Sequence, residues 1–398
     1  MVEAAHGGAM LTDTSPKAGQ RLGVLAILGL MALTALVGGL RFARADVAGT
    51  SFFATDNYYT YTTDDGHHLE HLNIDIVSYL SMIEQRRGND AAAYKMVPYQ
   101  SFVENGDVLM GPVAPFIYRP ALPFVASLLP IDAADSFALV NLVLVVAGTF
   151  FMVDALAVQG RSRNAQLIGG LIYAVSLPLL VFTSSLYIDG GAMAVFVIGY
   201  WLIARRCWWA LALFIPVSYA VKESLVFLVP SVVVAWRSSG RSFKDVRFLI
   251  GAPLVALAWA AVVVAVRVTA PTPTYSFSVL PKLNYIVNNL VNVTSSVFFV
   301  VGSATAMIPA LICVYRMTRE GGFASAFDRA GPEITGLIMF VLVNLYSIAS
   351  TDLTLRTAWV FWPFGVALTA LLVDDLHATS TPWRRALSDP RAPEQAAL

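Results

Sequence analysis

A short run in the first third of the 398-residue chain contains the side-chain types that acid–base chemistry needs. The run reads Asp64-Asp65-Gly66-His67-His68. Two adjacent carboxylates raise the pKa of one of them, which can then accept a proton as a general base. Asp64 and Asp65 are therefore the candidate catalytic residues. The alternative is that one of them caps a helix, because an apolar-patterned run follows.

Three of the five histidines of the chain lie in or directly after this run. His67 and His71 are four residues apart, so on a helix they would share a face that could bind a divalent metal. The candidate metal ligands are accordingly Asp65, His67 and His71. The alternative is a solvated polar face of a helix. The sequence requires no cofactor, although a divalent metal is compatible with it.

The composition defines where this chemistry would take place. Hydrophobic residues make up 57% of the chain and charged residues only 13%, against roughly 45–50% and 25% in soluble domains. The formal net charge is zero. These values exclude a soluble enzyme, a disordered protein and a nucleic-acid binder built on a basic surface. They indicate a polytopic membrane protein.

Apolar runs predict an all-α protein with about ten transmembrane helices. The first run follows Lys17 and Arg21 and is longer than the apolar core of a typical secretory signal, which favours an uncleaved span over a cleaved signal peptide. The expected spans are 23–41, 137–157, 165–184, 190–204, 207–221, 224–236, 246–268, 296–316, 333–350 and 357–374.

The positions of the basic residues orient these spans, because short cytoplasmic loops carry most Lys and Arg. The tails 1–22 and 376–398 are then cytoplasmic and flank a membrane domain over 23–375. A large first extracytoplasmic loop, 42–136, is expected to carry juxtamembrane helices. Its segment 112–130 holds five prolines, which suit a juxtamembrane position better than a lipid-exposed crossing.

A few ionisable residues remain that the orientation rule does not explain, and all fall on the outer side. Arg119 precedes the proline-rich segment at the level where a lipid phosphate would lie, although it could simply anchor that segment. Lys222 and Glu223 separate two short helices. This segment is either a site that binds phosphate or a polar turn between the helices. Asp189 and Arg356 lie on the same side. The spans themselves are almost free of charge at mid-membrane, where transporters place ionisable groups.

Four motifs follow one another along the chain: Asp64-Asp65, Tyr118-Arg119-Pro120-Ala121-Leu122-Pro123, Val221-Lys222-Glu223-Ser224 and Arg356-Thr357-Ala358-Trp359-Val360-Phe361-Trp362-Pro363. In this order they resemble the GT-C superfamily of membrane glycosyltransferases. The similarity extends over about 20–375 and is greatest to the protein O-mannosyltransferase and lipid A aminoarabinose transferase branch. Among the departures are Arg119, where a lysine is usual, and Gly66-His67-His68 after the acidic pair.

The resemblance implies an inverting hexosyl- or pentosyltransferase of cell-envelope glycan biosynthesis. It would move a sugar from a polyprenyl-phosphate donor to an extracytoplasmic hydroxyl of a lipid, a glycan or a protein. Asp64 or Asp65 would be the base, and Arg119 and Lys222 would hold the phosphate. The location implied is a bacterial inner membrane, with the site facing outward and membrane lipids, not nucleic acid, as partners. The residues expected to bind substrate are His67, His68, Tyr118, Arg119, Asp189, Lys222, Glu223 and Arg356.

Two other classes of protein remain open at this point. One is a transporter or flippase of a lipid-linked sugar, which predicts charged residues at mid-membrane. The other is a membrane-bound, metal-dependent hydrolase that uses His67, His68 and His71.

Overall fold

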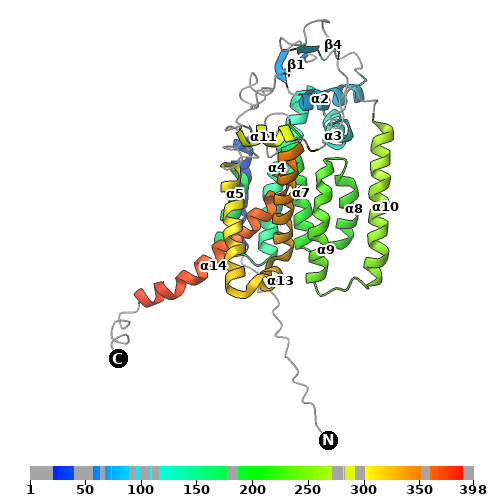
Figure 1. Ribbon diagram of the computed structural model, residues 1–398. Coiled ribbons are helices and arrows are strands. Elements are labelled where there is room, and N and C mark those ends of the chain that lie inside the picture. The colour runs from blue at the N-terminus through cyan, green and yellow to red at the C-terminus, as the bar shows by residue number, and fades with distance from the viewer. Residues whose placement is uncertain are drawn as a thin grey trace, which may run out of the picture.

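The structure is a computed structural model, and most of the residues that it describes are helical. Helices that are apolar on all sides run side by side, and a small sheet lies at one end of them together with α2 (Ile74–Arg86) and α3 (Ala121–Ser127) (Figure 1). We call this end the loop end. The residues described are 21–39, 57–62, 68–72, 74–88, 95–98, 108–109, 116–176, 179, 187–270, 281, 283–291, 301–350 and 359–388.

Helix lies within each of the ten predicted apolar runs, so the prediction of a helical, multi-pass membrane protein is confirmed. Among the described residues, however, only four helical segments are both long and apolar enough to cross a membrane, and the number of spans stays a prediction. These four are α4 (Ala133–Val158), α10 (Val246–Thr269), α13 (Met307–Ser350) and the segment Trp359–Ala378, which includes the start of α14 (Trp362–Ser388). The other helices are α1 (Val24–Gly39), α5 (Arg163–Ala174), α7 (Asp189–Ala204), α8 (Trp208–Ser218), α9 (Val229–Ser238) and α11 (Leu283–Val291).

The bundle is helical as predicted, and the first loop adds a small sheet that the prediction did not include. Its strands are β1 (Asn57–Thr62), β2 (His68–Leu72), β3 (Lys95–Pro98) and β4 (Val108–Leu109). They form an antiparallel sheet in the order β2-β1-β3-β4. The physical reason is local composition, because β1 reads Asn-Tyr-Tyr-Thr-Tyr-Thr, and aromatic and β-branched residues favour strands.

The sheet also removes one alternative for the acidic pair. Asp64 and Asp65 lie between β1 and β2, in a segment outside the described residues, and a strand follows them. The next helix begins only at Ile74. The helix-cap interpretation of the acidic pair is therefore wrong.

The core of the bundle lies where α7 packs against the start of α14. Phe196 of α7 contacts Phe361 and Phe364 at ring-centroid distances of 5.5 and 5.7 Å, and Tyr200 contacts Phe364 at 5.1 Å. All four rings are completely buried. Aromatic pairs in this edge-to-face geometry add stability beyond the area that they bury.

Gly336 of α13 offers a test of this packing. A Cβ atom at this position would lie 2.1 Å from Cδ2 of the buried Phe364. We expect Gly336→Ala to destabilise the protein by about 1–3 kcal/mol, because the ring has no room to move. Thermal unfolding of the purified protein in detergent measures the effect. Gly251→Ala in α10 is the matched control, since nothing lies within 4 Å of its Cβ position; an equal response of the two variants would contradict the packing.

Helix α10 lies at the edge of the bundle (Figure 1). Val266 is its only buried residue, and its main neighbour is α8. About halfway along α10, Trp259 packs edge-on against Tyr219, the residue that follows α8, at a ring-centroid distance of 5.7 Å. On the side of this contact away from the loop end, a groove opens between α10 and the bundle.

Candidate active site

Lys222 and Asp189 form a buried ion pair at the loop end. Lys222 is the extended residue at which the chain passes from α8 into the 3-10 helix η4 (Glu223–Leu228). Its Nζ donates a hydrogen bond to Oδ1 of Asp189 at 2.5 Å, and both side chains are only 3% exposed. Asp189 opens α7, and a helix N-terminus stabilises a carboxylate. Each of these buried charges compensates the other, because either charge alone would strongly destabilise the folded protein.

Arg119 and Glu223 form a second ion pair beside the first. The guanidinium donates from Nε to Oε2 of Glu223 at 2.8 Å and from Nη2 to Oε1. This is the two-pronged geometry in which Arg binds a carboxylate or a phosphate most strongly. Arg119 is buried, whereas the Glu223 side chain is 44% exposed. Glu223 is therefore the accessible half of the pair.

The two pairs are brought together by short connections in the chain. Lys222 and Glu223 are consecutive residues. The backbone N–H of Ala121, at the start of α3, donates to the carbonyl of Ala220 at 3.0 Å. This bond holds the segment that carries Arg119 against the turn that carries Lys222.

A tyrosine from the first loop completes the group. Nη1 of Arg119 donates to the hydroxyl of Tyr79 in α2 at 3.0 Å. Burial raises the pKa of Tyr79 well above its ordinary value; Arg119 opposes this shift, and the carboxylates of Asp75 and Asp189 add to it. The phenol is thus neutral at physiological pH. We call Tyr79, Arg119, Asp189, Lys222 and Glu223 the ion-pair cluster.

Helix α2 is fixed to the bundle by its last residues. Nη2 of Arg87 donates to the carbonyl of Leu129 and to Oγ of Ser136, both at 2.9 Å. The Arg86 guanidinium lies 5.1 Å from the centre of the Phe124 ring. These contacts hold α2 against α3 and α4, and so keep Tyr79 in the cluster.

The sequence analysis missed Tyr79, although a signal for it exists. Ile76, Tyr79, Leu80 and Ile83 recur at helical spacing in the first loop, and all four are completely buried. This periodicity predicts a helix packed on one face. A tyrosine on the packed face is a candidate for a buried hydrogen bond.

Tyr118 lies next to Arg119 in sequence, but its ring contacts a different cation. Arg267, at the end of α10, lies 3.6 Å from the centre of the Tyr118 ring. A guanidinium at this distance from an aromatic face is attracted to it electrostatically. Arg267 is a further cation at the loop end that the sequence analysis did not select.

Four of the eight residues predicted to bind substrate thus meet in the cluster: Arg119, Asp189, Lys222 and Glu223. Tyr118 is described as well, but its ring contacts Arg267, which is not part of the cluster. Asp64, Asp65, His67 and Arg356 lie outside the described residues, and for His68 the structure describes only the backbone.

The helical spacing on which the predicted metal site was based is not found in the structure. His71 lies in β2 and not on a helix, so the expectation that His67 and His71 share a helix face is wrong. Because Asp65 and His67 fall outside the described part of the chain, metal binding by these residues stays a prediction. Within the described part, no group of three or more His, Cys, Asp or Glu side chains could hold a metal ion.

Fold and cluster together define a multi-pass helical membrane protein with two adjoining ion pairs at one end of its bundle. No model of a protein family matches the sequence, and no curated protein matches it.

Solved structures that resemble the chain include an oligosaccharyltransferase from Archaeoglobus fulgidus. Its apo form is 13% identical with a TM-score of 0.40, and the match covers 90% of this chain and 51% of that one. The form in complex with Zn and sulfate is 14% identical with a TM-score of 0.37, covering 91% and 52%. The complex with an inhibitory peptide and a dolichol-phosphate is 13% identical with a TM-score of 0.38, covering 90% and 51%. The chain spans about half the length of these proteins, and a likeness at this level assigns no function.

Proposed function

We propose that the protein is a membrane glycosyltransferase of the GT-C type, which moves a sugar from a polyprenyl-phosphate donor to an acceptor hydroxyl. The observation that carries this proposal is the ion-pair cluster. Arg119 and Lys222 come from distant parts of the sequence, and the Ala121–Ala220 hydrogen bond together with the Arg119–Glu223 pair brings their segments together at the loop end. Both belong to motifs whose order resembles that superfamily. A cation pair at this depth suits the phosphate of a lipid whose tail lies among the helices.

The chemistry then divides between the cluster and the acidic pair. The acceptor oxygen forms a bond to the anomeric carbon of the sugar as the bond from that carbon to the phosphate oxygen breaks. Arg119 and Lys222 stabilise the negative charge that develops on the departing phosphate. Asp64 or Asp65 takes the proton from the acceptor hydroxyl. Attack from the side opposite the phosphate inverts the anomeric centre.

Glu223 controls access to Arg119 in this proposal. A phosphate that approaches Arg119 must displace the Glu223 carboxylate, which is the exposed member of the pair. We expect Glu223→Gln to tighten binding of a polyprenyl phosphate by roughly 3–10-fold, because a larger share of the protein then has Arg119 available. Fluorescence titration with a labelled polyprenyl phosphate measures the affinity.

The control for this variant is Glu320→Gln, which removes an exposed carboxylate 3.9 Å from Arg316 in α13. It should leave the affinity unchanged. Weaker binding by Glu223→Gln would contradict the displacement and would show that Glu223 orients Arg119 for the phosphate.

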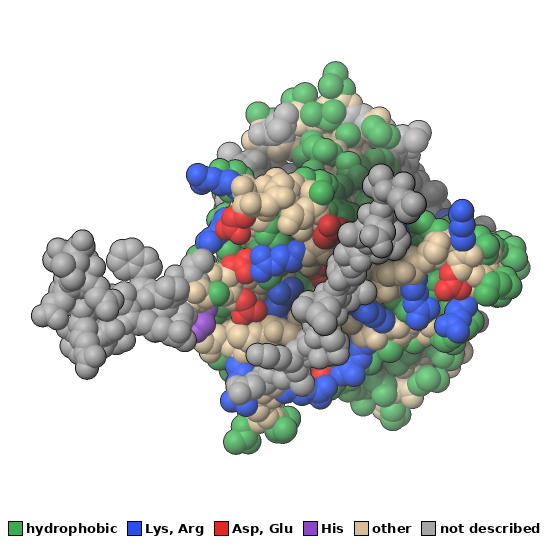
Figure 2. Space-filling model, turned by 90° about the horizontal axis from the view of Figure 1, so that it is seen from below, with side chains coloured by type: hydrophobic (Ala, Val, Ile, Leu, Met, Phe, Trp, Pro, Cys, Tyr) green, Lys and Arg blue, Asp and Glu red, His purple; other side chains and the backbone are tan. Residues whose placement is uncertain are grey.

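The orientation of the protein follows from its basic residues. Lys and Arg side chains are spread over the face seen from below, which is the end opposite the sheet (Figure 2). Cytoplasmic loops carry an excess of basic residues. The proposal therefore places the loop end, with the cluster, outside a bacterial inner membrane.

A transporter is the second class to test. It would place ionisable residues at mid-membrane. Among the described helices of the bundle, the buried carboxylates instead lie near helix ends or breaks. Asp189 opens α7 at the loop end, Asp154 lies near the end of α4, and Glu333 follows the break that α13 has at Ala330. This distribution favours a reaction at the membrane surface.

Transfer from a radiolabelled polyprenyl-phosphate sugar tests the function directly. The purified full-length chain is reconstituted into liposomes, with an envelope extract as the source of acceptor. The proposal expects label to leave the donor for a new product. If label instead crosses the membrane while still attached to the polyprenyl phosphate, the protein is a transporter and the proposal is wrong.

A further inference from the structure

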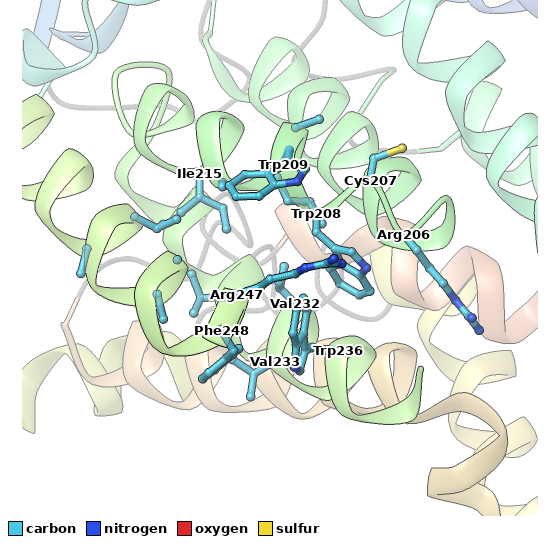
Figure 3. Close-up of a pocket in the computed structure, with 18 of the residues that line it drawn as sticks. Arg206, Cys207, Trp208, Trp209, Ile215, Val232, Val233, Trp236, Arg247 and Phe248 are labelled. Carbon is cyan, nitrogen blue, oxygen red and sulfur yellow. The ribbon is translucent and has the colours of Figure 1, made fainter. Parts of the chain in front are cut away.

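A second candidate binding site lies at the end of the bundle opposite the cluster. A groove of about 580 Å³ runs between α8, α9 and α10. Apolar side chains, among them four tryptophans and five valines, form most of its walls, with arginines at one end (Figure 3). Its length along α10, from Arg247 to Trp259, is about 18 Å at 1.5 Å per residue. This is close to one leaflet of a hydrocarbon core that is about 30 Å thick.

Two arginines place positive charge at the mouth of the groove. Arg247 is exposed at the start of α10, and its side chain reaches across the groove toward Trp208 (Figure 3). The Arg241 guanidinium lies 4.8 Å from the centre of the Trp236 ring and 5.8 Å from that of Trp208. Among the described residues, no carboxylate forms a salt bridge with either arginine. Asp245 is close in sequence, but its carboxylate caps α10 by accepting the Arg247 backbone N–H at 2.9 Å.

A third arginine near the groove, Arg206, has a backbone conformation that arginine rarely adopts. Arg206 follows the end of α7 with a φ of 55°. The backbone N–H of Cys207 donates to the carbonyl of Leu202, and that of Arg206 donates to the carbonyl of Ile203. In this type of helix end the position of Arg206 strongly favours glycine. An unfavourable backbone conformation that is retained points to a function for the side chain.

The directions of these side chains fit a lipid headgroup. Arg206 points away from the groove, whereas Arg247 lies across it (Figure 3). The cations are thus spread around the mouth at the level where headgroups lie. An apolar groove of leaflet length with cations at its mouth complements one acyl chain attached to a phosphate diester.

We propose that this groove binds one acyl chain of an anionic phospholipid, with the lipid phosphate at Arg241 and Arg247 and with Arg206 beside it. The lipid belongs to the leaflet opposite the loop end, so this site is separate from the one proposed for the donor. Its occupant fills the space between α10 and the bundle. Since α10 has few other neighbours, the lipid holds this helix in place.

Delipidated full-length protein in a neutral detergent provides the test. Phosphatidylglycerol and phosphatidylcholine are added separately, and lipid binding is followed by native mass spectrometry and thermal unfolding. The proposal expects phosphatidylglycerol to bind more tightly and to raise the unfolding temperature. Arg241→Gln/Arg247→Gln should weaken its binding by roughly 30-fold. Arg316→Gln/Arg319→Gln, which removes two charges from α13, should leave it unchanged.

Two further variants separate binding from folding. Arg206→Gly relieves the backbone conformation, so the lipid-free protein should unfold at the same or a higher temperature while it binds phosphatidylglycerol more weakly. Gly251→Phe places a ring into the groove without a change of charge and should also weaken binding, because Gly251 lines the groove. Equal binding of the two lipids, equal losses in both double variants, or a lipid-independent dimer that buries the groove would each overturn the proposal.

Discussion

Asparagine in place of the catalytic carboxylate is expected to slow sugar transfer by roughly 10²–10⁴-fold, the usual contribution of a general base. The two candidates are Asp64 and Asp65, which are tested separately as Asp64→Asn and Asp65→Asn. Asparagine has nearly the same shape but cannot take the acceptor proton. Binding of the donor should therefore be retained in the variant whose transfer is lost. Initial rates of transfer from a radiolabelled donor, measured beside donor affinity, give this comparison.

The same assay includes a control variant and tests whether activity depends on a metal. Asp56→Asn changes another carboxylate of the first loop and should leave the rate unchanged. Each protein is assayed with and without a chelator. A loss of wild-type activity with chelator would support the prediction that Asp65, His67 and His71 bind a metal. Full activity in both Asp64→Asn and Asp65→Asn would contradict the catalytic carboxylate.

The second large effect is expected at the buried pair of Lys222 and Asp189. Lys222→Met leaves the Asp189 carboxylate buried without this partner, and breaking a buried pair in this way costs about 3–5 kcal/mol. Lys222→Met/Asp189→Asn removes both charges and should recover most of that stability. Transfer should not recover, because the cation that stabilises the departing phosphate is missing, a loss of roughly 10²–10³-fold. Thermal unfolding and transfer rates are measured on the same preparations.

A matched pair at the other end of the bundle controls for the loss of charge itself. Arg205 donates to Asp154 through both Nε and Nη2, and Asp154 is buried. Arg205→Met/Asp154→Asn should retain transfer. Recovery of transfer in Lys222→Met/Asp189→Asn would show that its pair serves only to hold α7 and the turn together.

The apolar runs and the isolated charges were predictable from the sequence for the same physical reason. A charge within an apolar chain is costly to bury, so each one needs an explanation by orientation, by pairing or by function. The residues that the orientation rule did not explain included Arg119, Asp189, Lys222 and Glu223. In the structure Arg119 pairs with Glu223, and Lys222 pairs with Asp189. Their pairing partners could not be derived, because pairing depends on how α3, α7 and α8 meet.

The sheet and Tyr79 were missed for a different reason. Strand β1 pairs with β3 across a long stretch of sequence that includes α2, and no local pattern marks such a pairing. The helix-cap alternative for the acidic pair assumes that the apolar run after it, Leu69, Leu72, Ile76 and Leu80, forms one continuous helix. The chain instead divides this stretch between β2 and α2. Once α2 is recognised as a separate amphipathic helix, Tyr79 falls on its buried face.

Binding of a polyprenyl phosphate, compared with the polyprenol of the same length, tests the central claim most directly. The two ligands differ only in the phosphate, which the cluster is proposed to hold. Wild-type protein should bind the phosphate form at least roughly 10-fold more tightly, since a charge-assisted hydrogen bond contributes about 1.5–3 kcal/mol. Lys222→Met/Asp189→Asn, which keeps Arg119, should show a clearly smaller preference and still bind the polyprenol. Equal affinity of the wild-type protein for the two ligands would contradict the account.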